Sequence, residues 1–265
     1  MRAPLWQVDA FTDCPFTGNP AAVLVLESWL DDVVMQSIAA ENNLSETAFL
    51  VKEAEGWRVR WFTPKVEVDL CGHATLASAW VVLNKVEPGD AVTFASRSGP
   101  LPVTREGGRL VLDFPSNPPR ATMFPEHIER ILGKQVREVL ATKDHLVCVL
   151  DSVDAVATLT PDMGGIASLS KWAVIVTAPG GVGPGEGEVD FVSRFFAPKK
   201  GVGEDPVTGS AHCVLVPFWA KRLGKKTMVA RQVSKRGGTL FVEDCGERIR
   251  IGGNVAPYLE GWVSV

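Results

Sequence analysis

Three side chains of this sequence have the chemistry needed to move a proton. Glu46 directly precedes the strand-like run 47–52, so we expect it at a strand edge, where partial burial suits a carboxyl group to take and return protons near neutral pH. His73 stands at the start of an apolar segment and could supply or relay a proton. Asp205 precedes a second apolar segment and could position His73 or a substrate group. The sequence also allows simpler roles: a solvated turn carboxylate for Glu46, a capping or packing side chain for His73, and a turn-forming residue for Asp205.

A second set of residues could bind an anion or act as a nucleophile. Gly72 and Gly209 each open an apolar segment, and small residues there let a ligand approach backbone N–H groups closely. Ser210 could add an anion contact, or simply cap a helix. Cys71 could be a thiol activated at a helix N-terminus, or a buried inert cysteine. Asn19 lies in the segment 17–20, which is typical of a turn, although its side chain could touch a ligand.

Two nearly apolar segments, residues 72–83 and 209–220, are predicted to be helices buried on every side, because neither has a polar face. His212 lies inside the second and is expected in the core. The other apolar runs are short and rich in Val, Phe and Trp, which favours strands. Further helices are predicted from Ser28, as N-cap, to about Asn43, and from about Pro125 to Gly133. Each buried helix would then be wrapped by its own curved sheet.

An internal duplication links the two buried helices. The motif RWFTP at 60–64 recurs as RFFAP at 194–198, and LSETA at 44–48 recurs as LSKWA at 169–173. The first motif begins 12 residues before the helix-opening glycine in one copy and 15 residues before it in the other, so the second copy has three extra residues. Positions that differ between the two copies are candidates for reactive groups, because they would act from one half of the protein only. Glu46 aligns with Lys171, His73 with Ser210, and Cys71 with Thr208.

The duplication predicts two similar α/β halves joined at the proline-rich stretch 114–119. The first half would be residues 1–116, with a central helix from about residue 72, and the second residues 119–265, with a central helix from about residue 209; the last strand could cross back to the first half. Ligand sites tend to form in clefts between such halves, and two helix N-termini would attract a carboxylate. The glycine-rich stretch 180–188 is predicted to be a flexible hairpin connection.

Composition argues against several classes of protein. There are 27 Lys and Arg against 31 Asp and Glu, for a net charge of −4, which gives no support for a nucleic-acid surface. No apolar run approaches the ~18 residues of a membrane span, and the N-terminus lacks a signal-peptide pattern. Five widely spread cysteines without Cys-x-x-Cys spacing predict reduced thiols in a cytoplasmic protein with no metal site.

Five motifs together resemble the PhzF-like (phenazine biosynthesis-like) isomerase family. They lie at 9–12, 16–22, 43–49, 70–75 and 204–212, and the likeness extends from residue 5 over essentially the whole chain. The resemblance implies a diaminopimelate epimerase-like α+β fold with two pseudo-symmetric halves, each holding a central helix. It also implies a cofactor-independent proton shift within a small cyclic or unsaturated carboxylic acid. Members of the family are often homodimers.

The resemblance also assigns roles to individual residues. The acid/base glutamate of the family maps onto Glu46, its histidine onto His73 and its aspartate onto Asp205. Its anion-binding positions map onto Gly72, Gly209 and Ser210.

Related racemases and epimerases use one thiol before each helix-opening glycine. The matching positions here are Cys71 and Thr208, so two-thiol racemisation is not expected. A one-thiol racemase or epimerase that uses Cys71, and a non-catalytic ligand-binding or regulatory protein, remain as alternatives.

Overall fold

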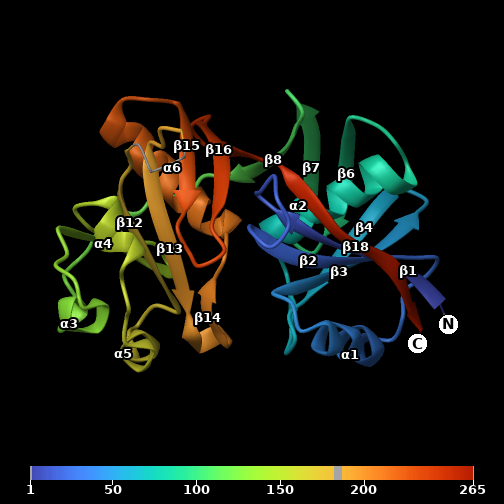
Figure 1. Ribbon diagram of the computed structural model, residues 1–265, viewed down its shortest axis with the longest axis horizontal. Coiled ribbons are helices and arrows are strands. Elements are labelled where there is room, and N and C mark those ends of the chain that lie inside the picture. Colours follow the sequence, from blue (N-terminus) through green and yellow to red (C-terminus); the bar gives the residue numbers. More distant parts are fainter. Residues whose placement is uncertain (1, 182–186, 265) are drawn as a thin grey trace. The chain divides into compact units, whose positions relative to one another are not determined.

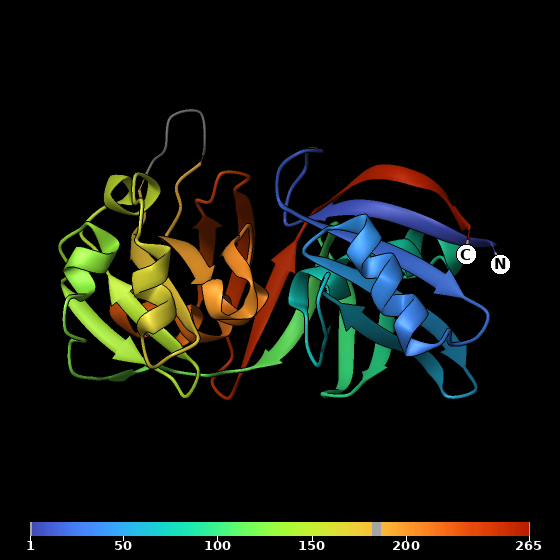
Figure 2. The same cartoon turned by 90° about the horizontal axis from the view of Figure 1, so that it is seen from below.

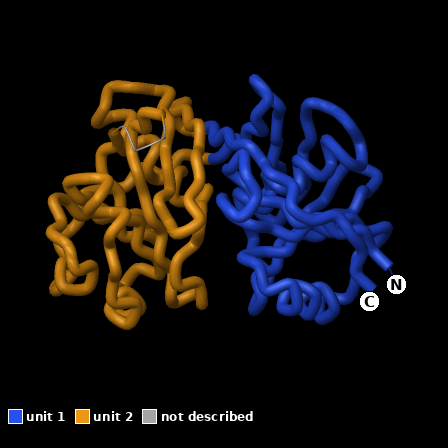
Figure 3. Tube along the Cα trace, in the orientation of Figure 1, with its two compact units in different colours: residues 1–114, 250–265 blue, residues 115–249 orange. Residues whose placement is uncertain are grey.

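The computed structural model describes residues 2–181 and 187–264 and divides into two compact units (Figure 3). Unit 1 comprises Met1–Phe114 and Arg250–Val265, and unit 2 comprises Pro115–Ile249. The sequence placed residues 119–265 in the second half and allowed the last strand to cross back to the first. Residues 250–265 belong to unit 1, where β18 (Val255–Ser264) runs antiparallel to β1 (Arg2–Ala10) along its length.

Residues 182–186 of the glycine-rich stretch lie outside the described part of the chain. Within the described part, no helix has both the length and the apolar character needed to cross a bilayer.

Unit 1 combines β-strands with a buried helix, α2 (Gly72–Val81), and a second helix, α1 (Asp32–Asn42) (Figure 1). Its other strands are β2 (Asn19–Leu26), β3 (Glu46–Glu53), β4 (Gly56–Phe62), β5 (Glu67–Val68), β6 (Ala91–Ser96), β7 (Gly99–Glu106) and β8 (Arg109–Pro115). The pairs β2–β3 and β4–β6 are parallel, whereas β1–β2, β3–β4, β4–β5, β6–β7 and β7–β8 are antiparallel. A π-helical turn, η1 (Val82–Val86), continues α2.

The helix α2 is buried almost completely, as its lack of a polar face predicted. Only Gly72 and Trp80 among its residues are not buried, and the helix packs against β1, β2 and β3. Its alanines and serine let the strands approach closely. On the opposite face of β3, Phe49 and Val51 belong to a separate hydrophobic cluster with α1. Figure 2 shows α1 lying against the strands of unit 1. Because side chains alternate along a strand, Glu46 shares the α2 face with Ala48 and Leu50.

The start of α1 differs from the prediction. The helix begins at Asp32 with Asp31 as N-cap, not at Ser28. Before it starts, Trp29 and Leu30 pack against the cluster under α1, and the Trp29 indole donates a hydrogen bond of 3.0 Å to Glu53 Oε1. These contacts hold the segment outside the helix. The C-terminal end agrees with the prediction, since Asn43 adopts the left-handed conformation that ends a helix, with φ of 49°.

Unit 2 contains β9 (Arg120–Ala121), β10 (Glu138–Ala141), β11 (His145–Val149), β12 (Ala173–Pro179), β13 (Phe191–Ala197), β14 (Val202–Asp205), β15 (Thr227–Gln232) and β16 (Gly238–Asp244), and β17 (Arg248–Gly253) begins in unit 2 and ends in unit 1. The pairs β11–β12 and β13–β15 are parallel. Its helices are α3 (Ile128–Leu132), α4 (Val153–Ala157), α5 (Met163–Ser168) and α6 (Gly209–Leu223), with a 3-10 turn η2 (Pro198–Lys200). The sequence did not predict α4 and α5, and it began α3 about three residues too early.

The duplication extends to individual contacts. In unit 1, Arg60 makes two hydrogen bonds to the Glu67 carboxylate, of 2.7 and 2.8 Å. In unit 2, Arg194 does the same with Glu204, at 2.6 and 2.9 Å. Each arginine comes from a long strand, and each glutamate from the short strand paired to it.

The three extra residues of the second copy lie between β13 and β14. Phe62 pairs with Glu67 across one hairpin and Phe196 with Glu204 across the other, so the register is the same although the second connection is longer. The 3-10 turn η2 lies in this connection. In the same register Asp205 corresponds to Val68, so Asp205 is a further position at which the two copies differ.

Burial of His212 in α6 predicts that the free energy of unfolding decreases at acid pH. His212 is fully buried, its Nδ1 lies 2.8 Å from the Thr208 carbonyl oxygen, and burial lowers its pKa to about 4. As pH falls, His212 therefore takes up a proton in the unfolded chain before it does so in the folded protein. The free energy of unfolding decreases as pH falls from the ordinary histidine pKa toward 4. Chemical denaturation at about pH 8 and about pH 4.5 should show that wild type loses about 2–3 kcal/mol more than His212→Gln. Equal losses in the two proteins would contradict this assignment.

Candidate functional site

Glu46 and His73 form the centre of the site in unit 1. Glu46 is the first residue of β3, and His73 is the second residue of α2, which packs against the same face of that strand. Glu46 Oε2 lies 3.1 Å from His73 Nε2, and the two side chains are 16% and 4% exposed. Glu46 is therefore not the solvated turn carboxylate that the sequence also allowed. The pair brings a partly accessible carboxyl group against a buried imidazole.

Asn19 and Cys71 surround the other ring nitrogen of His73. The Asn19 amide Nδ2 lies 3.1 Å from His73 Nδ1, and Cys71 Sγ lies 3.5 Å from the same atom. Asn19 is fully buried as the first residue of β2, so the prediction of a turn residue is wrong. The Asn19 side chain points into the site and contacts the His73 imidazole. Because that ring is buried, Asn19 is buried with it. An amide can serve a neutral or a protonated imidazole, because it offers either an N–H or a carbonyl oxygen.

The site shifts the pKa values of the Cys71 thiol and the His73 imidazole so that the thiol stays neutral and the imidazole is protonated more readily. Burial, together with the nearby Glu46 carboxylate, raises the pKa of Cys71 to about 11. Burial alone would lower the pKa of His73, but the neighbouring Cys71 and Glu46 raise it well above its ordinary value. Since the thiol is uncharged at neutral pH, Glu46 is the neighbour that raises the pKa of His73 there. The site thus favours a protonated imidazole, with a thiol that is a poor nucleophile.

Backbone amides at the start of α2 face the same region of unit 1. Cys71 is the N-cap in an extended conformation, and it provides no side-chain cap to the helix. The first N–H groups of a helix have no helical acceptor, and they carry partial positive charge. Gly72, at the first position, adds no side chain that would keep a ligand away. A carboxylate bound here would lie beside Glu46 and His73.

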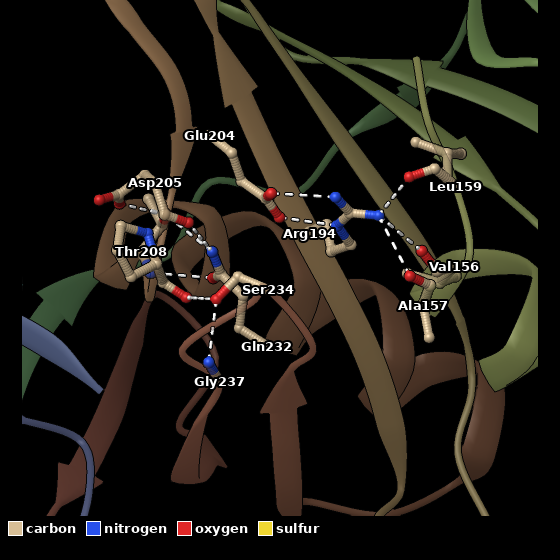
Figure 4. Close-up of polar contacts among 11 residues, drawn as sticks. Val156, Ala157, Leu159, Arg194, Glu204, Asp205, Thr208, Gln232, Ser234 and Gly237 are labelled. Carbon is tan, nitrogen blue, oxygen red and sulfur yellow. Dashed lines mark hydrogen bonds and ion pairs between the residues drawn. The ribbon is translucent and has the colours of Figure 1, made fainter. Parts of the chain in front are cut away.

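The remaining predicted residues, Asp205, Gly209 and Ser210, lie in unit 2, and Figure 4 shows Asp205 with its neighbours Thr208 and Gln232. Thr208 is the N-cap of α6, in the same extended conformation as Cys71, and its hydroxyl donates a hydrogen bond to Asp205 Oδ2. Gln232, fully buried at the end of β15, accepts a hydrogen bond of 2.9 Å from the Thr208 N–H and donates one of 2.6 Å to the Asp205 carbonyl. Asp205 is therefore held in one position rather than free in a turn.

Gly209 and Ser210 occupy the first two positions of α6, as predicted. Ser210 is exposed and does not cap the helix, because Thr208 is the N-cap. The structure thus gathers Asn19, Glu46, Cys71, Gly72 and His73 in unit 1, and Asp205, Gly209 and Ser210 in unit 2.

Two features of the site were missed from the sequence. Gln232 is one, although the pattern in β15 could have found it: Met228, Ala230 and Gln232 alternate on the buried face of that strand. The other is that Glu46, Cys71 and His73 lie close enough to act as ligands of one cation, with all three ligand atoms within 4.8 Å of one another. The sequence analysis considered only Cys-x-x-Cys spacing and so predicted no metal site.

Known proteins resemble this chain over its whole length. A family model described as phenazine biosynthesis-like protein, PhzC-PhzF, matches residues 8–261. A curated protein of Pseudomonas aeruginosa, named an uncharacterized isomerase, is 51% identical over 262 residues, or 98% of each chain. A crystal structure of a phenazine biosynthesis protein of the PhzF family from Enterococcus faecalis is 46% identical, with a TM-score of 0.95 over 100% of both chains.

More distant structures share the fold alone. A hydroxyproline epimerase from Agrobacterium vitis is 10% identical, with a TM-score of 0.60 over 99% of this chain and 92% of the other. Together with the PhzF structure, this likeness confirms the α+β, diaminopimelate epimerase-like fold that the sequence predicted.

Proposed function

Because the chain belongs to the phenazine biosynthesis-like PhzC-PhzF family, we propose that it is an isomerase that moves a proton within a small unsaturated or cyclic carboxylic acid, with Glu46 as the general acid/base. The relatives are named isomerases, which establishes the reaction class. The observation that carries the finer proposal is the contact between Glu46 and His73 at the N-terminus of α2, with 3.1 Å between Oε2 and Nε2. It combines a proton acceptor, a cationic partner and an anion-binding helix end in one unit.

The proposed reaction has two proton transfers and no net change in composition. The Glu46 carboxylate removes a proton from a carbon next to an unsaturated or carboxyl-bearing centre, and the electron pair of that C–H bond delocalises into the conjugated system. The Glu46 carboxyl group then returns the proton to another carbon of the same molecule, and the double bond moves. The protonated His73 lies beside the negative charge and stabilises it. Backbone N–H groups at the start of α2 bind the substrate carboxylate.

The group in unit 2 enters the proposal through the family resemblance. We assign Asp205 to orienting a substrate group and the N-terminus of α6, with Gly209 and Ser210, to binding an anion. The hydrogen bonds of Asp205 to Thr208 and of Gln232 to both residues support this assignment, since a group that orients a substrate must itself be held in place.

Exchange with deuterium oxide tests the proposal without requiring the natural substrate. The protein is incubated in deuterium oxide with a panel of small unsaturated, cyclic and α-substituted carboxylic acids, and carbon-bound deuterium is measured by mass spectrometry and NMR. We expect deuterium to enter at least one acid at two carbons, together with formation of its isomer. Binding of acids with neither exchange at any carbon nor formation of an isomer would favour a ligand-binding protein and would contradict the proposed isomerase.

Replacing Cys71 distinguishes the proposed mechanism from a one-thiol racemase. Cys71→Ser should retain exchange within about tenfold of wild type, because the thiol is not the group that accepts the carbon-bound proton. The measurement is the initial rate of deuterium incorporation, with a circular dichroism spectrum to verify folding. If Cys71→Ser loses all exchange while Glu46→Gln keeps it, the thiol mechanism is correct and the one proposed here is wrong.

A further inference from the structure

We propose that unit 1 has a second binding site, for a free α-amino acid, in a cavity beside the turn that joins β7 to β8. The cavity has a volume of about 330 Å³, and all of its lining residues belong to unit 1. Small-molecule sites have volumes of about 300–1,000 Å³, so the cavity has room for a small ligand. Binding there does not depend on the function proposed above, because neither Glu46 nor His73 lines the cavity.

Four segments that are distant in the sequence supply the lining. Asp13 lies in the connection between β1 and β2, Trp80 in the last turn of α2, and Asn254 between β17 and β18. Arg105 and Arg109 lie on either side of the two-glycine turn between β7 and β8. Both glycines of this turn have positive φ, and a Cβ at either one would meet nothing within 4 Å. The turn therefore brings two arginines to the cavity without filling it.

The negative charge of the cavity, Asp13, has no cationic partner. Its side chain is exposed, and Oδ1 accepts a hydrogen bond of 2.6 Å from the uncharged Asn254 amide. Among the described residues, no arginine, lysine or histidine lies within ion-pair distance of this carboxylate. Asp13 is therefore not neutralised by Arg105 or Arg109, although all three side chains line the same cavity.

The positive charge of Arg105 is only weakly engaged. The Arg105 side chain is 27% exposed, and its Nη2 donates a hydrogen bond of 3.3 Å to the Asn84 side chain. Its one ion pair joins Nε to Asp90 at 3.6 Å, which is too long for a hydrogen bond, and the Asp90 side chain is 89% exposed. A guanidinium has five N–H donors, so most of those of Arg105 remain available to a ligand.

A ligand that carries both charges would pair with both groups. The planar guanidinium of Arg105 matches the geometry of a carboxylate and binds it through two parallel hydrogen bonds. The Asp13 carboxylate would accept a hydrogen bond from an ammonium group. Trp80, which is only partly buried, offers an aromatic surface for an apolar side chain. A free α-amino acid carries a carboxylate, an ammonium group and a side chain on one carbon atom, and so combines all three features.

The charges also disfavour simpler ligands. A carboxylic acid without an ammonium group would lie close to the Asp13 carboxylate and leave it without a counterion. An amine without a carboxylate would meet two guanidinium groups, those of Arg105 and Arg109. Because like charges in close contact cost free energy, the cavity should discriminate against both classes.

Isothermal titration calorimetry with three related probes tests the inference on the full chain. The probes are L-phenylalanine, 3-phenylpropionate, which lacks the ammonium group, and phenethylamine, which lacks the carboxylate. We expect one L-phenylalanine to bind per chain. Each of the other two should bind at least about tenfold more weakly, because each loses a hydrogen-bonded charge pair.

Two variants should change the selectivity in opposite directions. Asp13→Asn keeps an oxygen for the contact with Asn254 and should abolish the preference for L-phenylalanine over 3-phenylpropionate. Arg105→Gln should abolish the preference for L-phenylalanine over phenethylamine. A purely structural role of either residue would weaken all probes alike. Asp90→Asn is the matched control, because it removes a carboxylate beside Arg105 that does not line the cavity, and it should keep both preferences.

Hydrogen–deuterium exchange of the backbone locates the bound amino acid even if a variant fails to fold. Saturating L-phenylalanine should slow amide exchange in residues 105–110 and 253–255 of the wild-type protein. Absence of binding, equal binding of L-phenylalanine and 3-phenylpropionate, or protection at the start of α2 alone would overturn the inference.

Glu46→Gln separates this site from the proposed catalytic groups. It should bind L-phenylalanine as wild type does, even though it loses deuterium incorporation into carbon. If Glu46→Gln loses both properties, the amino acid binds beside Glu46 and the cavity is not its site. If L-phenylalanine binds at the cavity and no acid exchanges with solvent, only the proposed function is wrong.

Discussion

Glu46→Gln is expected to lower the rate of deuterium incorporation into the substrate by about 10²- to 10⁴-fold, the usual contribution of a general acid/base. Glutamine keeps the size and the polarity of the side chain, so it still fits against His73, but it cannot accept a proton from carbon. The substrate carboxylate should still bind at the start of α2. The loss should therefore be seen in kcat rather than in KM.

Glu53→Gln is the matched control for this variant. Glu53 ends the same strand β3, where it pairs with Arg58 and accepts a hydrogen bond from Trp29, so it tests the effect of losing a carboxylate at the other end of the strand. It should leave exchange unchanged. A second readout separates proton transfer from altered folding: removal of the Glu46 charge should lower the pKa of His73, which NMR titration measures. Unchanged exchange in Glu46→Gln would sink the mechanism.

Arg194→Met is expected to destabilise the protein by about 2–3 kcal/mol, because it removes one partner of a partly buried, hydrogen-bonded charge pair. Besides its two bonds to Glu204, Arg194 donates hydrogen bonds to the carbonyl oxygens of Leu159 and Val156, at 2.6 and 3.2 Å (Figure 4). Methionine would leave the Glu204 carboxylate, whose side chain is only 22% exposed, without a cation. Urea denaturation monitored by circular dichroism measures the change.

An exposed ion pair of the same unit provides the control. Arg137 contacts Asp151, and both side chains are more than half exposed, at 57% and 51%. Arg137→Met should therefore leave the free energy of unfolding close to that of wild type. Equal losses in the two variants would show that Arg194 acts as a surface charge. Arg194→Met should also reduce activity if Asp205 takes part in the reaction, because Glu204 and Asp205 are neighbours on β14.

The parts of this fold that the sequence predicts best are those where one local pattern dominates. Apolar residues on every face predict α2 and α6, and Gly224 ends α6 in the left-handed conformation, with φ of 67°. The short helices α4 and α5 have five and six residues, too few for a hydrophobic period to emerge, so tertiary packing decides them. The start of α1 was missed for a related reason, since contacts of Trp29 with the core override a plausible N-cap.

The candidate site shows the same division between local and long-range information. The types of Glu46 and His73, together with their alignment against Lys171 and Ser210, single them out from the sequence alone, and Asp205 is found by its place before the second buried helix. The contact of His73 with Asn19 depends on where β2 begins relative to α2, which no local pattern gives. Asn19 was for this reason placed in a turn.

The return of the last strand to unit 1 gives the chain an order of assembly during synthesis. Unit 2 is one continuous stretch, whereas the edge of β1 has to wait for β18, which follows the whole of unit 2 in the sequence. Until then, β1 exposes a row of backbone donors and acceptors that could pair with another nascent chain. The sheet of unit 1 is thus completed only after unit 2 has been synthesised, and a chain that stops before β18 would lack the strand that pairs with β1.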